Sequence, residues 1–280
     1  MAESGDWTYE GFDGGTRVAR TWVNESPRYI ALLCHGYGEH IGRYEHVAEH
    51  LVRHGAVVHG VDHVGHGRSA GERVLVPDYE PVVEDFHVLD LAARTHNRDL
   101  PVVLVGHSMG GTVAARYAQL HGNTLAALVL SAPVLGSWAV LPELLAHEQI
   151  PDAPIDPDTL SRDPAVGKAY AEDPLVWHGP FKRPTLEGLS RALETITAAG
   201  RLGAVPTLWL HGEDDLLVPI EATRTGVERL KGSDFREKTY PGARHEILNE
   251  TNAEEVLADV TAFVDEQLSR LAGRGRYAVE

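Results

Sequence analysis

The sequence predicts an α/β protein in which a mostly parallel central sheet carries helices on both faces and an inserted cap over one edge. Short apolar runs alternate with helical stretches along most of the chain, which is the pattern of strand–helix units in a parallel sheet. Glycine and polar residues gather directly after these runs, where the loops at the carboxyl ends of such strands form binding sites. A proline-rich stretch interrupts the alternation after Pro133 and marks the cap.

The length and composition fit a single domain over residues 1–280. Charged residues make up 24% and hydrophobic residues 43% of the chain, as in ordinary globular proteins. The formal net charge of −16 argues against nucleic acid as a partner and against electrostatic docking on anionic lipid. It leaves open a contact with lipid through an apolar patch.

The cysteine content and the N-terminus indicate a cytoplasmic protein. Cys34 is the one cysteine, so no internal disulfide can form, which fits a reducing compartment. Residues 1–10 contain neither the basic segment nor the apolar stretch of a secretory signal. No apolar run approaches the length of a membrane span. We therefore expect a cytoplasmic protein that associates with membranes at most peripherally.

The N-terminal part of the chain predicts a hairpin followed by two strand–helix units. Two β-like runs within residues 7–23 meet at Asp13-Gly14-Gly15, which is a hairpin signal. Continuous apolar runs at 29–34 and 57–61 predict buried strands. The stretches 44–54 and 79–96 have the spacing of helices.

Residues 102–112 (VVLVGHSMGGT) are the stretch around which the rest is organised. Their four leading apolar residues predict a buried strand, and a helical run follows over 112–121. Between them lies a G-x-S-x-G sequence in the strand–turn–helix setting that gives this motif its meaning. Gly106 and Gly110 have no Cβ to clash in so tight a turn, so Ser108 can adopt a strained backbone that exposes its hydroxyl. A turn that merely ends a strand is the weaker alternative.

The chain departs from the alternation after the next predicted strand, at 125–130. Nine of the sixteen prolines fall between Pro133 and Pro184, which excludes another regular strand–helix unit. We interpret residues 134–179 as a cap inserted over the active edge of the sheet. Its apolar side chains are expected to be exposed; they include Leu135, Trp138, Val140, Leu141, Leu144 and Leu145. A disordered linker is the alternative, but the leucine and tryptophan content argues against it.

The sheet pattern resumes with predicted strands at 206–210 and 235–240. A helix is expected after Pro219, and the last helix is expected at 252–271, where apolar residues recur at helical spacing. The loops after these two strands carry the remaining candidates for catalysis.

The strand-end loops together supply a complete set of serine-hydrolase residues. A serine hydroxyl needs a base, and the base needs a third group to orient it. Ser108, Asp215 and His245 follow in the order expected of an α/β-hydrolase. His245 is chosen among sixteen histidines because it lies in the loop after the last strand. Asp214 competes for the role of the acid, but neighbouring side chains turn apart, and we favour Asp215.

Three other histidines allow a metal-binding interpretation. His46, His50 and His54 recur at every fourth position of one predicted helix. Because Val47 and Leu51 occupy its core-facing side, the histidines form a solvated face. A His-x-x-x-His pair without the glutamate of H-E-x-x-H is weak evidence for zinc. We therefore predict no metal site.

Three motifs together resemble the monoacylglycerol lipase family of α/β-hydrolases. They are residues 35–44 (HGYGEHIGRY), 62–69 (DHVGHGRS) and 106–111 (GHSMGG). The segments 161–164, 173–175 and 211–219 are also similar to that family. The match covers nearly the whole chain and keeps the family's order.

The resemblance implies an α/β-hydrolase fold and a serine esterase that needs no metal or organic cofactor. It implies that Ser108 is the nucleophile, Asp215 the acid and His245 the base. The backbone N–H groups of Tyr37 and Met109 would form the oxyanion hole. The Tyr37 side chain stands where relatives often have a smaller residue, so we expect it to narrow the acyl tunnel.

The resemblance also implies the partners. An apolar cap that guides a single acyl chain to the serine makes a monoacylglycerol, a small lipid, the expected substrate. The cap is expected to contact lipid surfaces transiently through an exposed apolar patch. Hydrolysis would give free fatty acid and glycerol through an acyl-enzyme.

Three alternatives remain open at this stage. A lysophospholipase or a general carboxylesterase would use the same residues. An aminopeptidase or a carbon–carbon bond hydrolase could share the fold, although an apolar cap argues against a charged peptide substrate. A catalytically silent hydrolase fold that only binds a ligand is the third, and the intact set of serine, acid and histidine argues against it.

Overall fold

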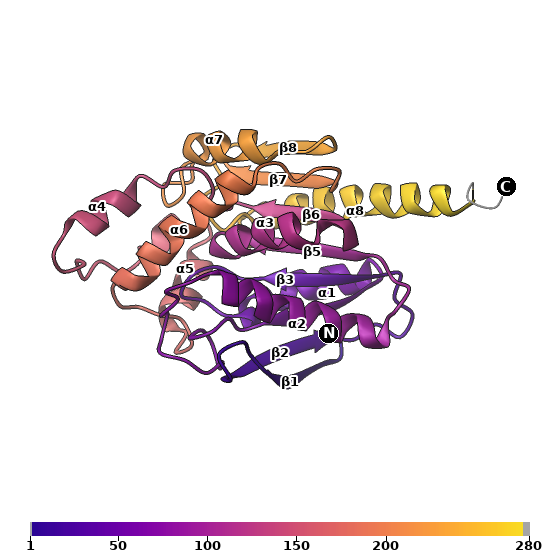
Figure 1. Cartoon of the computed structure of the whole chain (residues 1–280), viewed down its shortest axis with the longest axis horizontal. Coiled ribbons are helices and arrows are strands. Elements are labelled where there is room, and N and C mark those ends of the chain that lie inside the picture. Colours follow the sequence, from indigo (N-terminus) through magenta and orange to yellow (C-terminus); the bar gives the residue numbers. More distant parts are fainter. Residues whose placement is uncertain (1, 277–280) are drawn as a thin grey trace.

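The computed structural model describes residues 2–276, which form one eight-stranded sheet with helices on both faces (Figure 1). The strands are β1 (Ser4–Glu10), β2 (Thr16–Trp22), β3 (Tyr29–Cys34), β4 (Ala56–Val61), β5 (Val102–His107), β6 (Leu125–Ser131), β7 (Thr207–Gly212) and β8 (Phe235–Tyr240). Their order across the sheet is β1-β2-β4-β3-β5-β6-β7-β8. The pairs that contain β2 are antiparallel and the others are parallel, so the predicted fold class is confirmed.

Helices cover both faces of this sheet. They are α1 (Glu45–Arg53), α2 (Glu80–His96), α3 (Met109–His121), α4 (Val140–Ala146), α5 (Pro164–Glu172), α6 (Arg183–Ala199), α7 (Ile220–Leu230) and α8 (Ala253–Arg276). Short 3-10 turns occur at Ile41–Tyr44, Gly122–Thr124, Pro157–Thr159 and Ile247–Asn249. The residues of α1 and α8 pack into the core on one face, and those of α2, α3 and α6 pack into the core on the other.

The central strands are buried along their whole length. Every residue of β3, β4, β5, β6 and β7 is buried, because helices cover them on both sides. This is why these strands form continuous apolar runs in the sequence rather than alternating patterns. The edge strand β8 is only partly buried and reads as a polar sequence, FREKTY.

Four helices differ from the sequence-based expectation: α3 in its first residue, and α4, α5 and α6 because none of them was predicted. Helix α3 begins at Met109 rather than at residue 112, because the turn at Ser108 leads straight into it. Helix α6 was not predicted, because it follows a proline-rich stretch; Pro184 lies in its first turn, where proline is tolerated. Its Leu186, Leu189, Leu193 and Ile196 are buried on one side at helical spacing.

Residues 132–206 join β6 to β7 and contain the segment 134–179 that we predicted as a cap. In Figure 1, α4, α5 and α6 gather at one end of the sheet, opposite the end reached by the C-terminal part of α8. The expectation that the apolar side chains of this segment are exposed was wrong. Leu135, Trp138 and Leu141 are buried, and Val140, Leu144 and Leu145 are half-buried, because they pack into the same core as the apolar side of α6.

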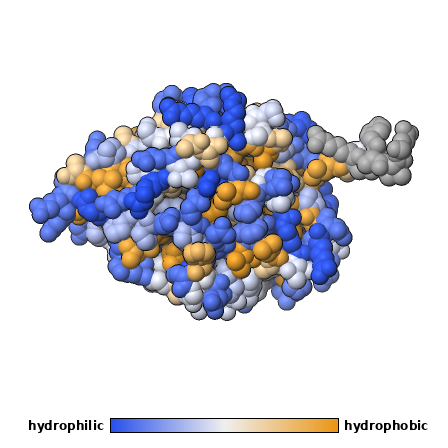
Figure 2. Space-filling model, viewed as in Figure 1, coloured by the Kyte–Doolittle hydropathy of each residue, from blue (hydrophilic) through white to orange (hydrophobic). Residues whose placement is uncertain are grey.

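The surface seen in Figure 2 is mainly hydrophilic, with small groups of hydrophobic residues scattered over it. Within residues 2–276, no helix combines the length and the apolar character that crossing a bilayer requires.

Candidate active site

Ser108 occupies a sharp turn between β5 and α3. Its backbone has φ 55° and ψ −120°, a conformation that residues other than glycine rarely adopt. The glycines of the motif are required by close contacts on both sides of the turn. A Cβ on Gly106 would lie 2.5 Å from the carbonyl oxygen of Gly110, and a Cβ on Gly110 would collide with the carbonyl oxygen of Cys34. The chain therefore presents the serine hydroxyl at the end of the sheet.

The structure brings the three predicted residues together in one hydrogen-bonded chain. His245 Nε2 lies 2.9 Å from Ser108 Oγ, and His245 Nδ1 lies 2.8 Å from Asp215 Oδ2. All three residues are buried. This is the geometry in which an imidazole can remove the serine proton while a carboxylate orients the ring.

The two neighbouring aspartates lie in different environments. Asp215 is buried, and its Oδ1 accepts the backbone N–H groups of Leu217 and Val218 at 3.0 and 2.8 Å. Asp214 is exposed to solvent, and its backbone N–H donates to the carbonyl oxygen of Ala243. Burial raises the pKa of Asp215, but the adjacent histidines more than offset burial, and the pKa lies well below its ordinary value. The carboxylate is therefore ionised beside His245.

His245 lies in the loop after β8, directly before the turn Ile247–Asn249. Burial by itself lowers the pKa of this imidazole, but the Asp215 carboxylate more than offsets burial, and the pKa lies above its ordinary value. The neighbouring ring of His107, 4.9 Å away between centroids, has the opposite tendency: burial lowers its pKa to about 4. His107 instead holds the end of β6, with Nδ1 3.1 Å from the Ser131 carbonyl.

The backbone N–H groups of Tyr37 and Met109 are the predicted oxyanion donors. Within residues 2–276, neither donates to a backbone carbonyl. Met109 is the first residue of α3, where N–H groups have no intrahelical partner and the helix dipole favours negative charge. The loop around Tyr37 is held from both sides, because Glu39 Oε1 accepts the Gly36 N–H at 2.6 Å and the Gly38 carbonyl accepts the N–H of Trp177 at 2.7 Å.

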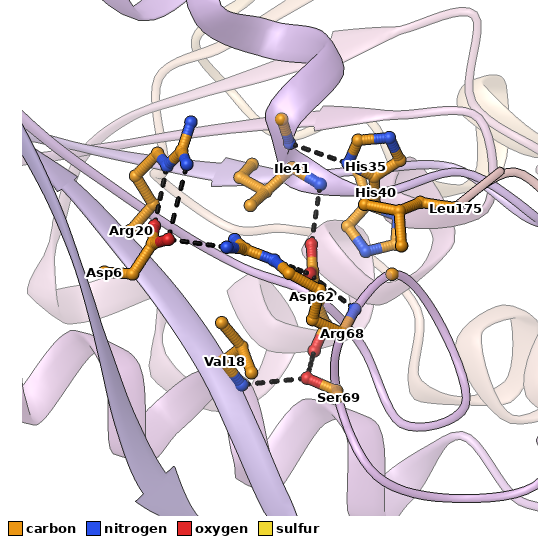
Figure 3. Close-up of polar contacts among 12 residues, drawn as sticks. Asp6, Val18, Arg20, His35, His40, Ile41, Asp62, Arg68, Ser69 and Leu175 are labelled. Carbon is orange, nitrogen blue, oxygen red and sulfur yellow. Dashed lines mark hydrogen bonds and ion pairs between the residues drawn. The ribbon is translucent and has the colours of Figure 1, made fainter. Parts of the chain in front are cut away.

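A polar network beneath this loop connects it to the edge of the sheet (Figure 3). Asp62 Oδ1 accepts the Ile41 N–H at 2.8 Å, and its Oδ2 accepts the Arg68 N–H at 2.9 Å. The Arg68 guanidinium reaches Asp6 of β1, which also pairs with Arg20 of β2. The loop that carries the predicted oxyanion donor is therefore braced by the antiparallel hairpin β1–β2.

An apolar cavity begins at Ser108 and extends under the segment 134–179. Its walls include Tyr37 and Tyr79 from the main body, and Trp138, Ile155 and Phe181 from the segment between β6 and β7. Its volume is about 40 Å³. The rings of Tyr37 and Phe181, which both line the cavity, stack with their centroids 4.7 Å apart.

A second cavity, called the polar cavity for the charged groups in its wall, is also lined by Ser108, and its volume is about 30 Å³. His245, Glu39, Arg43 and Glu246 line it together with apolar residues, of which Tyr37, Ile155 and Leu217 also line the apolar cavity. Arg43 lies 2.7 Å from Glu39 and 2.7 Å from Glu246, and its guanidinium is 5.0 Å from the ring centroid of Tyr170. Burial raises the pKa of Glu246, but Arg43 more than offsets it and holds the pKa at about 2.

Glu39, Arg43 and Glu246, which line this polar cavity, were not predicted as functional residues from the sequence. Glu39 and Arg43 stand in the stretch 35–44 that was quoted for its family resemblance, so a signal for them existed. Glu246 carried no signal beyond its place next to His245. Among residues 2–276, no group of three or more histidine, cysteine or acidic side chains is arranged to hold a metal ion.

A mostly parallel sheet with a strained serine at a strand–helix turn, hydrogen-bonded to a histidine and an aspartate, defines a serine hydrolase of the α/β-hydrolase class. Residues 25–252 match the family described as serine aminopeptidase, S33, and the chain belongs to that family. The chain is 38% identical to a monoacylglycerol lipase of Mycolicibacterium smegmatis, over 90% of this chain and 94% of that protein. It is 32% identical to the monoglyceride lipase of Homo sapiens, over 83% and 80% of the two chains.

Solved structures agree with this assignment. A thermostable carboxyl esterase from Bacillus coagulans, in complex with glycerol, has a TM-score of 0.79 and 25% identity, over 96% of this chain and 99% of that one. The monoacylglycerol lipase of Paleococcus ferrophilus has a TM-score of 0.74 and 27% identity, over 93% and 99%. The family resemblance predicted from the motifs is thereby confirmed.

Proposed function

We propose that this protein hydrolyses monoacylglycerols to free fatty acid and glycerol through an acyl-enzyme. The observation that carries the proposal is that Ser108 lines two neighbouring cavities, one apolar and one whose wall includes the charged residues Glu39, Arg43 and Glu246. A monoacylglycerol has the same two parts, an acyl chain and a glycerol head, on either side of its ester carbonyl. The names of the relatives from Mycolicibacterium smegmatis and Homo sapiens support the same substrate.

In the first half of the reaction, Ser108 Oγ attacks the ester carbonyl while His245 Nε2 takes its proton. Asp215 orients the imidazole and stabilises its protonated form. The backbone N–H groups of Tyr37 and Met109 stabilise the negative charge on the tetrahedral oxygen. His245 then donates the proton to the leaving glycerol oxygen, and the acyl group stays on Ser108.

In the second half, a water molecule takes the place of glycerol. His245 removes its proton as it attacks the acyl-enzyme, and the same N–H groups stabilise the second tetrahedral oxygen. Collapse of this intermediate releases the fatty acid and returns the proton to Ser108 Oγ. The water enters from the polar cavity, since His245 lines that side.

The apolar cavity is the proposed site for the acyl chain. Each methylene that leaves water there contributes about 0.8 kcal/mol. The cavity is narrow, with a volume of about 40 Å³, and widens if its walls separate. Trp138 and Ile155 belong to residues 134–179, and Tyr37 to the main body. We therefore propose that residues 134–179 act as a cap that moves away from Tyr37 to admit the substrate.

The polar cavity is the proposed site for the glycerol head. Arg43 supplies N–H donors, and the carboxylates of Glu39 and Glu246 supply acceptors, which together suit a molecule whose hydroxyl groups both donate and accept. Because these charges are already paired with one another, a neutral head group is favoured over a charged one.

Contact with a lipid surface is proposed at the rim of the cap. None of the exposed large hydrophobic residues of the described chain lies in 134–179, where Val140, Leu144 and Leu145 are half-buried. Leu216 is 77% exposed in the loop that follows Asp215, next to Leu217, which lines both cavities. We propose that this side chain touches the lipid aggregate while substrate enters.

A hydrolysis panel tests the proposed function. The substrates are mono-, di- and triacylglycerols of one acyl chain, a lysophospholipid, a short acetyl ester and an aminoacyl peptide. We expect the order monoacylglycerol, diacylglycerol, triacylglycerol, with the last nearly inert, because one roofed cavity accepts one chain. Equal rates on mono- and triacylglycerol emulsions would contradict the single-chain argument. A preference for the lysophospholipid or the acetyl ester would establish the related phospholipase or carboxylesterase activity instead.

A further inference from the structure

The carboxylate of Asp215 has a second imidazole beside it. His211 Nε2 lies 3.2 Å from Asp215 Oδ2, the same oxygen that lies 2.8 Å from His245 Nδ1. The other oxygen, Oδ1, accepts the backbone N–H groups of Leu217 and Val218. The side chains of His211 and Asp215 are fully buried, so water does not compete for these positions. Two histidine rings therefore lie within 3.2 Å of Asp215 Oδ2.

The hydrogen bonds of His211 determine which of its nitrogens carries the proton. Trp209 and His211 alternate with a buried leucine on β7, so their side chains share one face of the sheet. Trp209 Nε1 lies 3.2 Å from His211 Nδ1, and an indole N–H can only donate. His211 Nδ1 therefore accepts, and the ring carries its proton on Nε2. That N–H donates to the carbonyl oxygen of Val218, which is 2.8 Å away, and Nε2 also lies 3.2 Å from Asp215 Oδ2.

We propose that His211 is a positioning residue for the reaction: its Nε2–H, held by the Val218 carbonyl, stands 3.2 Å from Asp215 Oδ2 and partly offsets the negative charge that would otherwise act on His245. The proposal rests on the roles assigned above to Ser108, Asp215 and His245. It follows that His211 determines how firmly the acid holds the protonated base. The base must accept a proton from serine and then release it to the leaving group, so an attraction that is too strong would slow the second step.

The backbone contacts of Asp215 make the direction of the effect predictable. If His211 loses its donor, the N–H groups of Leu217 and Val218 still hold Oδ1, and His245 still holds Oδ2. The carboxylate stays in place and its charge acts on His245 alone. His245 should then keep its proton to higher pH.

Other ionisable groups also face the His245 ring and must be kept constant. Glu246 follows it in the chain, Glu39 faces it from the loop after β3, and both are paired with Arg43. His107 lies against the ring from the end of β5. A change at His211 leaves these four residues unaltered, so a shift in the titration of His245 can be assigned to the contact with Asp215.

The test compares His211→Phe, which keeps a ring but removes the donor, with His211→Gln, which keeps an N–H donor. The pH dependence of kcat/KM is measured with p-nitrophenyl acetate, an activated ester that needs neither the acyl cavity nor the glycerol site. For His211→Phe we expect the acidic limb to move up by about half a pH unit to one unit. For His211→Gln we expect the limb to remain at the wild-type position. A proton NMR titration of His245 in the resting enzyme gives the same shift without any substrate.

The outcomes separate this proposal from the proposed function. An acidic limb of His211→Phe that is unchanged or moves down, or an equal shift in His211→Gln, would overturn the role of His211. A wild-type protein that does not react with p-nitrophenyl acetate at all would overturn the proposed catalytic function instead. If His211→Phe does not fold, Trp209→Phe replaces it. This variant frees His211 Nδ1 to take the proton, so we expect a smaller shift in the same direction, and its absence would overturn the proposal.

Discussion

Arg43 holds Glu246 through two parallel contacts: its Nη1 and Nη2 atoms lie 2.7 and 2.8 Å from the two carboxylate oxygens. The same guanidinium contacts Glu39, so one buried cation joins the loop after β3 to the residue next to His245. Because Glu39 also accepts the Gly36 N–H, the pair connects the base to the loop of the proposed oxyanion hole. The two halves of the site are thus held at a fixed distance.

Removing Arg43 should destabilise the fold in a pH-dependent way. Arg43→Met leaves two buried carboxylates without their cationic partner, which is expected to lower the free energy of unfolding by about 3–5 kcal/mol near neutral pH. In the wild type, the pKa of Glu246 is lowered to about 2 from an ordinary value of 4.5. The stabilisation that Glu246 gives to the folded state is therefore complete at pH values above its ordinary pKa. It is lost as the pH falls toward the pKa of Glu246 in the folded state.

In Arg43→Met the sign of that dependence should reverse. Without the arginine, burial loses the main group that offsets it, although Asn249 and His107 remain. We expect the pKa of Glu246 to rise above its ordinary value, so protonation on acidification relieves the buried charge and the variant regains stability. Urea unfolding followed by circular dichroism at several pH values measures both slopes. Arg236→Met, which breaks an exposed pair with Glu266, is the matched control and should change stability by less than about 1 kcal/mol. Parallel pH profiles for Arg43→Met and the wild type would contradict the prediction.

Ser108→Ala should abolish turnover and leave the fold intact. The substitution removes the nucleophile but keeps a Cβ at the same strained position. Activity on a p-nitrophenyl ester and labelling by a fluorophosphonate probe should both disappear, while thermal unfolding stays close to wild type. Adding His245→Ala should cost little more, because the residues act as a unit. Turnover near the wild-type rate in a normally folded Ser108→Ala protein would exclude Ser108 as the nucleophile.

Asp215→Asn should lower kcat by several powers of ten, on the order of 10⁴, because the amide cannot hold His245 in the required tautomer. Asp214→Asn is the matched control. Its side chain is exposed one residue away, so we expect an effect of at most a few-fold. The kcat values of both variants are measured by steady-state kinetics on one ester. A severe loss of kcat in Asp214→Asn, together with a mild loss in Asp215→Asn, would reverse the assignment of the acid.

Tyr37→Ala should widen the apolar cavity and shift the preference toward longer acyl chains. Its ring lines the cavity and stacks on the ring of Phe181. Its proposed oxyanion donor is a backbone N–H, which the substitution retains. Tyr37→Phe keeps the ring and removes only the hydroxyl, which is buried without a hydrogen-bond partner in the described structure, so its chain-length profile should match wild type. Profiles of kcat/KM over p-nitrophenyl esters of increasing length compare the two. A Tyr37→Ala profile that matches wild type would show that this ring does not limit the chain.

Much of the fold and the core of the site could be predicted because the signals are local. The turn at Ser108 is signalled by residues within a few positions of it. Gly106 is required by a contact with Gly110 inside the turn, and Gly110 by its close approach to the end of β3 at Cys34. Strands β3 and β5 are buried on both faces, so their continuous apolar runs are unambiguous. Asp215 and His245 could be found because parallel strands bring the loops at their carboxyl ends together.

The remaining features depend on partners distant in the chain. Arg43 and Glu246 are separated by 203 positions, and nothing in either neighbourhood indicates the other. The burial of Leu135 and Trp138 could not be recognised because it depends on α6, which itself was hidden behind a run of prolines. His211 carries no local sign of its contact with Asp215, because a histidine at the end of a buried strand is equally consistent with a purely structural role.

The direct pairing of β6 with β7 makes the intervening segment exchangeable. Leu128 lies opposite Thr207 and Ser131 opposite Leu210, so the sheet is continuous whatever the chain does between these strands. Ser108, Asp215 and His245 all lie outside that segment. A chimera that receives a foreign segment between Gly136 and Lys182, with α6 retained, would keep these three residues but would lose the carbonyls of Thr159 and Leu160, which accept the N–H groups of His245 and Glu246 at 3.4 and 2.7 Å. Recombination of this one module can therefore change substrate choice only where the incoming segment supplies equivalent contacts to the loop of His245.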